Sequence, residues 1–311
     1  MFAAFITTIL FSISAVSGSR SSRILGGTEA HFWRLAFATM LLGLFVYFWG
    51  QATRDTAFKI LFVSGCIGFG LGDLALFQAL PRLGSRISMM FGSCLAAPMA
   101  ALIEWLWLGT RLTPEQMLCS ATILAGITIA LVPGEHVAIP RRQWLWGAFL
   151  GLLAALSQDW GAVLSRKAFA VALQAGDNLD GITAAYHRIL GGMVVTLPAF
   201  LIVKRKILVL ALTADSRTMD GFRDEKRAAW RRAWPWVLLN GLAGPALGVA
   251  CYQWALKIYP TGIVLPIVAI TPLVIIPFSR YLEGERPTVR SLIGGLIAVA
   301  GAVALAKVGH H

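Results

Sequence analysis

The chain has 311 residues, of which 57% are hydrophobic and only 14% are charged, and its formal net charge is +12. Because soluble domains carry about 25% charged residues, this composition excludes an ordinary soluble protein and indicates a membrane protein. The sequence also lacks a glycine-rich loop followed by Lys and Ser or Thr, which excludes the usual phosphate-binding loop of a nucleotide-driven pump.

Ten long apolar segments follow one another from the N-terminus. A helix needs about 20 such residues to cross a bilayer, and these segments must be helical because lipid offers the backbone no hydrogen-bond partner. The first segment has no basic stretch before it and no small-residue cleavage site, so we expect a retained helix and not a signal peptide. The predicted spans cover 2–24, 29–49, 57–79, 84–108, 114–133, 143–171, 181–203, 235–256, 262–282 and 289–308.

Much of the positive charge lies in one stretch between the seventh and eighth spans. Residues 203–233 hold nine Lys or Arg and four acids, and three tryptophans follow among the arginines of 227–236. This composition predicts a basic interfacial loop that contacts anionic lipid, with an amphipathic anchor at its end. We do not expect nucleic acid to bind there.

Two stretches, 64–80 and 240–256, share a pattern of glycines. The three glycines of each stretch fall on one face of a helix, where small residues let helices approach closely in lipid. We therefore expect helix-packing positions, and a sliding surface for gating is the alternative. The corresponding glycines, each offset by 176 residues, are Gly65 and Gly241, Gly68 and Gly244, and Gly72 and Gly248.

The repeat extends over the whole chain and divides it into two halves, residues 1–137 and 138–311. Arg34 and Arg188 occupy equivalent positions in the two halves. Each half has five predicted spans, and because five is odd the second half must enter the membrane from the opposite side. We therefore expect an all-α polytopic membrane protein with ten transmembrane helices, arranged as two inverted five-helix repeats around a central cavity.

Several short motifs in this order and spacing resemble a known family. These are Gly-Thr-Arg at 109–111, its counterpart Gly-Glu-Arg at 284–286, the end of span six at 163–169, and the stretch 72–86. The chain resembles a ten-helix EamA-type transporter of the drug/metabolite transporter superfamily. The resemblance implies export or exchange of small metabolites, and Thr110 departs from the family's usual Glu.

Two carboxylates lie within predicted spans, where a central charge costs about 2.5–3.5 kcal/mol on insertion scales. For Asp73 and Asp159 we consider three interpretations: the side chain lines the cavity, it forms an internal salt bridge, or the span boundary is misplaced. We expect both to line the central cavity, with Asp73 interacting with the substrate or with a cationic side chain such as Arg34. Val249 takes the place of Asp73 in the second repeat, which predicts an asymmetric site. Arg34 and Arg188 either line the cavity or tie helices together.

Other residues complete the candidate site. His187 adjoins Arg188, and Pro266 with Pro272 would break backbone hydrogen bonds in span nine and kink a gate-forming helix. We expect no cofactor, metal or catalytic residue, because the four cysteines lie within spans without metal-ligand spacing. The aromatic cavity candidates are Trp160, Tyr186, Tyr252 and Trp254.

The sequence thus predicts a secondary transporter of a small amino-acid-like or amphipathic metabolite, working by alternating access as an exporter or exchanger in a prokaryotic inner membrane. A channel or a membrane-embedded sensor is the alternative. Orientation stays open, because Lys and Arg counts favour termini outside the cell whereas the resemblance implies cytoplasmic termini. The substrate, the coupling ion and a homodimeric state also stay open.

Overall fold

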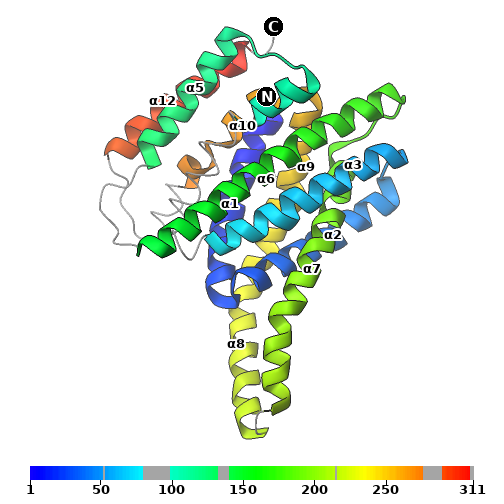
Figure 1. Cartoon of the computed structure of the whole chain (residues 1–311), viewed down its shortest axis with the longest axis vertical. Coiled ribbons are helices and arrows are strands. Elements are labelled where there is room, and N and C mark those ends of the chain that lie inside the picture. Colours follow the sequence, from blue (N-terminus) through cyan, green and yellow to red (C-terminus); the bar gives the residue numbers. More distant parts are fainter. Residues whose placement is uncertain (52, 80–98, 132–139, 214–215, 276–288, 309–311) are drawn as a thin grey trace.

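The computed structural model describes residues 1–51, 53–79, 99–131, 140–213, 216–275 and 289–308, and in these residues all regular secondary structure is helical. The N-terminal end of α1 and the C-terminal end of α12 lie at the same end of the molecule, and α7 and α8 project at the opposite end (Figure 1). This placement agrees with an even number of spans.

Within the described residues, ten helical segments follow the order of the predicted spans. Six are long and apolar enough to cross a membrane, and three shorter apolar stretches and α5 complete the ten. The ten-helix prediction is therefore confirmed. The segments are α1 (Phe2–Leu25), α2 (Gly27–Trp49), α3 with η1 (Asp55–Ala79), Met99–Leu108, α5 (Pro114–Leu131), α6 (Arg141–Gln174), α7 (Gly181–Thr213), α8 with η2 and α9 (Ser216–Ile258), α10 and its continuation (Thr261–Ile275), and α12 (Val289–Val308).

The two repeats interleave, because the first helix of each half packs on the third helix of the other half. In the first half α1 contacts α8, η2 and α9, and in the second half α6 contacts α3 and η1. The second helices, α2 and α7, contact each other. Pairing of equivalent elements across the molecule is the arrangement expected for an inverted repeat.

Both third helices contain a π-helical turn at the same place in the repeat. The element η1 covers Cys66–Gly72 and η2 covers Leu242–Ala246, so the two begin 176 residues apart. A π-turn inserts an extra residue into an α-helix and occurs often at functional sites. The chain thus changes helical geometry immediately before Asp73 in the first half and shortly before Val249 in the second.

Span nine is broken where its prolines predict a kink. Helix α10 (Thr261–Val268) ends in a turn at 269–270, and a new helical stretch starts at residue 271. Pro266 lacks the N–H that would bond to the carbonyl of Gly262, and the hydroxyl of Ser120 on α5 donates to this carbonyl instead, at 3.1 Å. Pro272 likewise leaves the carbonyl of Val268 free, and the neighbouring Thr271 hydroxyl donates to it at 2.6 Å.

We expect the Ser120→Ala substitution to destabilise the folded protein by about 1–2 kcal/mol, because it leaves a buried carbonyl without a donor. Thr122→Ala is the matched control, since among the described residues the Thr122 hydroxyl bonds only to Leu118 of its own helix. The cost of this control in unfolding free energy should stay within about 0.5 kcal/mol. Thermal unfolding of the two purified variants compares them. Equal stabilities would show that the α5 hydroxyl does not support the broken helix.

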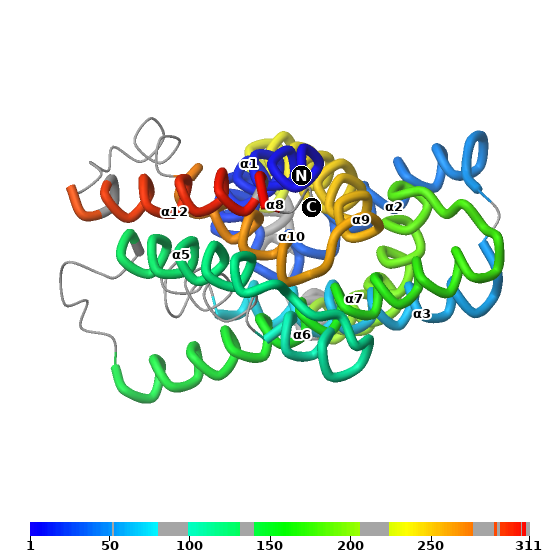
Figure 2. The backbone as a smooth tube through the Cα atoms, turned by 90° about the horizontal axis from the view of Figure 1, so that it is seen from above, coloured from blue at the N-terminus to red at the C-terminus, as the bar shows by residue number. Residues whose placement is uncertain are grey.

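The fifth helices of the two repeats, α5 and α12, lie side by side (Figures 1 and 2). Their contact is built on glycine: a Cβ on Gly126 would come within 2.5 Å of the Ala298 nitrogen, and a Cβ on Gly294 within 2.5 Å of the Ala130 nitrogen. Since backbone atoms on both sides cannot move out of the way, the contact requires glycine.

Neighbouring glycines of α12 provide a matched test of this contact. Gly294→Leu should force α12 away from α5 and lower the yield and thermal stability of the folded protein. Gly295→Leu should leave both unchanged, because no atom of another described helix lies within 4 Å of the position that its Cβ would occupy. If the two variants behaved alike in thermal unfolding, close α5–α12 contact would not be needed for stability.

The prediction of a loop at 203–233 is wrong in its secondary structure. Helix α7 continues to Thr213 and α8 starts at Ser216, so the segment forms two helices that project beyond the rest of the bundle (Figure 1). High charge does not distinguish a loop from a polar helix. A helix outside the lipid forms its backbone hydrogen bonds internally, whereas a loop forms them with water, and both tolerate charged side chains.

Candidate functional site

A buried ion pair lies where the two repeats meet. The Arg34 guanidinium on α2 contacts the Asp73 carboxylate, which follows η1, and both side chains are about nine-tenths buried. The amide of Gln158 on α6 donates to the same carboxylate at 2.7 Å. The contact between Asp73 and Arg34 that the sequence suggested is therefore present, and the lining of a cavity by Asp73 stays a prediction. The ion pair joins the second and third helices of the first repeat, and Gln158 connects it to the first helix of the second repeat.

Hydrogen bonds extend this pair to three more elements. Arg34 Nε donates to His31 Nδ1 at 3.2 Å, and His31 Nε2 lies 3.2 Å from the hydroxyl of Thr196 on α7. Asn240 on α8 accepts from Arg34 at 3.5 Å and from Ser14 on α1 at 2.7 Å. The network thus connects six elements from both repeats, so a change in the relative position of the repeats must rearrange it.

Arg188, the repeat equivalent of Arg34, has a different environment. Its guanidinium lies 5.2 Å from the ring centroid of Phe69 and is packed beside Gly68 and Gly161, where an added Cβ would come within 2.9 Å of Nη2. The side chain is buried, and its Nε has no hydrogen-bond partner. Within the described residues Arg188 forms no ion pair, and Val249 takes the place that Asp73 has in the first repeat.

Two further buried polar groups of the second repeat have no partner in the described part of the chain. Both carboxylate oxygens of Asp159 on α6 are unpartnered and the residue is 0% exposed. Both amide atoms of Gln253 on α9 are also buried without a hydrogen bond. The phenol of Tyr252, next to Gln253, lies within electrostatic range of Arg188 and Asp159. Buried polar groups are normally bonded, so these unpartnered atoms point to a ligand or to another state of the protein.

A second charged network lies at the connection between α9 and α10. The Glu104 carboxylate accepts from the Thr261 nitrogen at 2.7 Å and from the Thr261 hydroxyl, which places a negative charge at the N-terminus of α10. Arg166 on α6 lies 3.3 Å from Glu104 and donates to the Leu256 carbonyl at the end of α9. The pair therefore ties residues 99–108 and α6 to both helices.

The remaining predicted residues fall into several environments. Trp160 and Trp254 are about half exposed, whereas Tyr252 is buried against Phe11 of α1. Tyr186 lies against Gly43 of α2. His187 contacts Phe58 edge-on at 4.9 Å. The six repeat glycines lie at close approaches of helices or side chains: an added Cβ would come within 3 Å of a neighbouring atom at Gly65, Gly68, Gly72, Gly241, Gly244 and Gly248.

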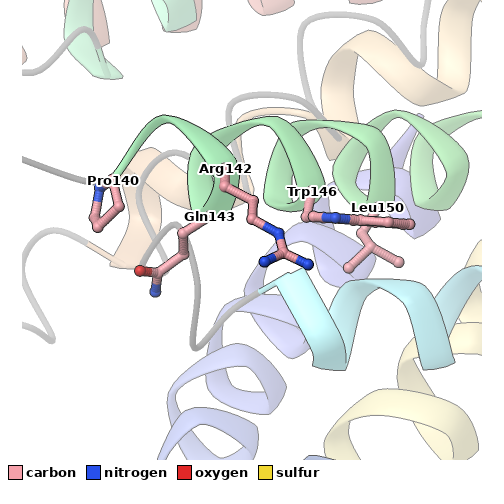
Figure 3. A pocket seen from close by; sticks show the side chains of 5 residues that line it. All are labelled: Pro140, Arg142, Gln143, Trp146 and Leu150. Carbon is pink, nitrogen blue, oxygen red and sulfur yellow. The ribbon is translucent and has the colours of Figure 1, made fainter.

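Two hollows on the surface do not contain the predicted site residues. One is formed by the first turns of α6, with Arg142 and Trp146 beside each other (Figure 3). The other lies on α8, with Arg227, Arg231 and Arg232 beside Asp224. Each hollow is lined by side chains of one helix end or helix face, so neither is the site where the repeats meet.

The sequence interpretation missed the uncharged members of the buried network. It considered full charges within spans, whereas His31, Gln158 and Asn240 are polar residues without a permanent charge. It also missed Gln253, a buried amide outside this network. A usable signal was present, because His31 and Arg34 are three residues apart and share a helical face. Residues 84–98 of the predicted 84–108 span and the motif at 284–286 lie outside the described residues.

The interleaved inverted repeats and the buried charges between them define a polytopic helical membrane transporter. Models of the EamA-like transporter family match residues 1–132 and 145–306, and the chain belongs to this family. A solved structure described only as a crystal structure of a protein matches with a TM-score of 0.69 at 15% identity, covering 99% of this chain and 97% of that one. This likeness supports the fold alone. No curated protein matches the sequence significantly.

Proposed function

We propose that the protein is a secondary transporter that moves a small amino-acid-like or amphipathic metabolite by alternating access, as an exporter or exchanger in a prokaryotic inner membrane. The observation that carries the proposal is the set of buried charged and amide groups between the repeats. Groups from both halves meet there, and Asp159, Arg188 and Gln253 keep unpartnered polar atoms. Charges in a membrane interior are costly unless they are used.

In this mechanism each repeat moves against the other around the substrate. The Arg34–Asp73 pair keeps α2 joined to the third helix of its own repeat, while Gln158 reaches it from the other repeat. The Glu104–Arg166 network joins elements of both repeats at the α9–α10 connection, and it must open whenever substrate passes on that side. In this proposal the helices bend at the two π-turns and at the break that follows α10.

Lipid has a separate role in the proposal. The basic face of α8, with Arg227, Arg231 and Arg232, supports a contact with anionic headgroups on the side of the membrane from which α7 and α8 project. This contact would hold the projecting helices at the membrane surface while the bundle moves.

Counterflow in proteoliposomes tests the transport proposal. Purified full-length protein is reconstituted, loaded with an unlabelled amino-acid mixture, and assayed for uptake of labelled amino acids from outside. We expect saturable uptake that is accelerated by internal substrate, with empty liposomes as the control. Flux that does not saturate and shows no counterflow would support the channel alternative. Binding without flux of any compound would support a sensor.

A further inference from the structure

The helices that project from the bundle are joined at their base to one short segment of α2, residues 29–34 (Figure 1). The Glu29 carboxylate, in the first turn of α2, accepts a hydrogen bond from Lys204 Nζ on α7 at 2.8 Å. Almost one turn further along α2, the Phe32 ring stacks on the Phe200 ring of α7 with 4.1 Å between the ring centroids. An ion pair and a stacked ring pair therefore fix α7 to α2 where α7 leaves the bundle.

Helix α8 is fixed at its base by aromatic contacts. Trp33 of α2 lies edge-on to Trp230 of α8, with 5.4 Å between the ring centroids. Near the end of α1, the Arg20 guanidinium lies 4.5 Å from the ring centroid of Trp236. Edge-on ring pairs and cation–π contacts stabilise such packing in addition to the area they bury. The projecting part of α8 is therefore not free to move independently of α1 and α2.

The same segment of α2 also carries the centre of the buried network. Between the contacts at its base, Arg34 contacts Asp73 and donates to Asn240 of α8 at 3.5 Å. His31 Nε2 lies 3.1 Å from the Phe69 carbonyl oxygen within η1. Because packed interiors are close to incompressible and transmit strain, a displacement of this segment by the projecting helices must shift Arg34 against Asp73 and η1.

The basic face of α8 lies at the height where lipid headgroups are expected. Arg231 and Arg232, both exposed, precede Trp236 by five and four residues, which is about 6–8 Å along a helix. Tryptophan concentrates at the membrane interface, and the headgroup layer on each side is about 5–8 Å thick. Arg227 lies about 6 Å further out, which is within the Debye length of about 8 Å. The three guanidinium groups can therefore attract anionic headgroups together.

We propose that anionic lipid headgroups on the basic face of α8 regulate the transport cycle, and that residues 29–34 of α2 carry the effect to the buried network. This inference rests on the proposed transport function and makes the lipid a regulator in addition to an anchor. Headgroups bind best to α8 in the position where Trp230 packs on Trp33. Since a ligand shifts a protein toward the state that it binds better, anionic lipid stabilises the state in which the network is formed.

Hydrogen exchange measures this effect without a known substrate. The purified full-length protein is placed in nanodiscs of phosphatidylcholine alone and in nanodiscs of equal parts phosphatidylcholine and phosphatidylglycerol. We expect the amides of residues 29–34 and of η1 to exchange at least about 5-fold more slowly in the mixed lipid. Helix α12, which packs chiefly on α5, should exchange equally in both.

Variants of the basic face test where the lipid acts. Arg227→Gln, Arg231→Gln and Arg232→Gln combined should remove the difference between the two lipids. The matched control is Arg141→Gln with Arg142→Gln, which removes exposed arginines from the start of α6. Because α6 and α8 cross the membrane in the same direction, these arginines lie on the same side, and the control should keep the lipid effect.

A second pair of variants tests the connection through α2. Glu29→Gln with Trp33→Leu should still retain phosphatidylglycerol in native mass spectrometry, yet η1 should no longer exchange more slowly in the mixed lipid. Trp49→Leu is the control, because it removes a tryptophan from the other end of α2 whose ring contacts in the described residues are with Phe45 and Phe48 of its own helix. This control should keep both the lipid retention and the lipid effect.

Transport gives an independent measurement of the regulation. Because the network must rearrange in each cycle, saturable uptake in the counterflow assay should be at least about 5-fold slower in the mixed lipid than in phosphatidylcholine. Equal uptake in the two lipids would overturn the regulatory role and leave the transport proposal standing. If no compound showed saturable flux, the transport proposal would fail, and hydrogen exchange would still decide whether lipid acts on the network.

Three exchange results would contradict the inference. Equal exchange of residues 29–34 and η1 in the two lipids would mean that the network does not respond to headgroup charge. A lipid effect that persists without the three arginines of α8 would place the lipid elsewhere. The same slowing by inorganic phosphate in phosphatidylcholine nanodiscs would assign the basic face to a soluble anion and not to lipid.

Discussion

Replacing Asp73 with valine is expected to destabilise the folded protein by about 3–5 kcal/mol, because it leaves the buried Arg34 guanidinium without its counter-ion. The loss should exceed that of a typical core substitution, since the Gln158 amide also loses the shorter of its two hydrogen bonds and keeps only the one to the Gly68 carbonyl. Thermal unfolding of the purified variant in detergent or nanodiscs measures the effect, together with the yield of membrane-inserted protein.

A double variant shows whether the unpaired charge causes this loss. Asp73→Val combined with Arg34→Leu removes both charges, and replacing a whole buried pair with apolar residues is often nearly neutral. The double variant should therefore be more stable than Asp73→Val alone, which a double-mutant cycle expresses as a coupling energy. A double variant that is less stable than either single variant would contradict the view that the two charges depend on each other.

Replacing Gly65 with leucine is expected to destabilise the protein by about 3 kcal/mol or more, because overpacking at a contact of backbones cannot be relieved by side-chain rotation. A Cβ at Gly65 would come within 1.7 Å of the Arg188 carbonyl oxygen, so α3 and α7 must separate. The same displacement moves Arg188 away from Gly68 and Gly161, and substrate binding should fall with stability.

The Gly295→Leu variant is the control for Gly65→Leu, because it adds the same side chain to a spanning helix without a close neighbour. It should express, unfold and bind like the unmodified protein. The equivalent contact, Gly241 against the Arg34 carbonyl at 2.9 Å, is looser, so Gly241→Leu should be less damaging than Gly65→Leu. A reversed order of the two would mean that the contact distances do not govern stability.

The helical membrane fold, the ten-segment order and the family follow from the sequence by itself. Hydropathy determines the fold and the order of the segments, because lipid leaves the backbone no structure but a helix in an apolar segment of sufficient length. The family was indicated by the order and spacing of the short motifs, such as Gly-Thr-Arg at 109–111. The repeat of glycines at an offset of 176 residues also located the paired third helices, and both of these helices contain a π-turn at the corresponding place. The break in span nine followed from Pro266 and Pro272, which lack backbone donors.

Only the tertiary structure decided which charges pair and which do not. Arg34 and Arg188 are equivalent in sequence, yet one contacts an acid and the other has no ion pair in the described residues, because partner choice depends on helices that are distant in the chain. The same three interpretations applied to Asp73 and Asp159 in the sequence. In the structure the Asp73 carboxylate accepts a hydrogen bond from Gln158, whereas the Asp159 carboxylate has no partner in the described residues. The helices at 203–213 and 216–233 were also decided by structure, since apolar periodicity identifies a helix only where one face is buried.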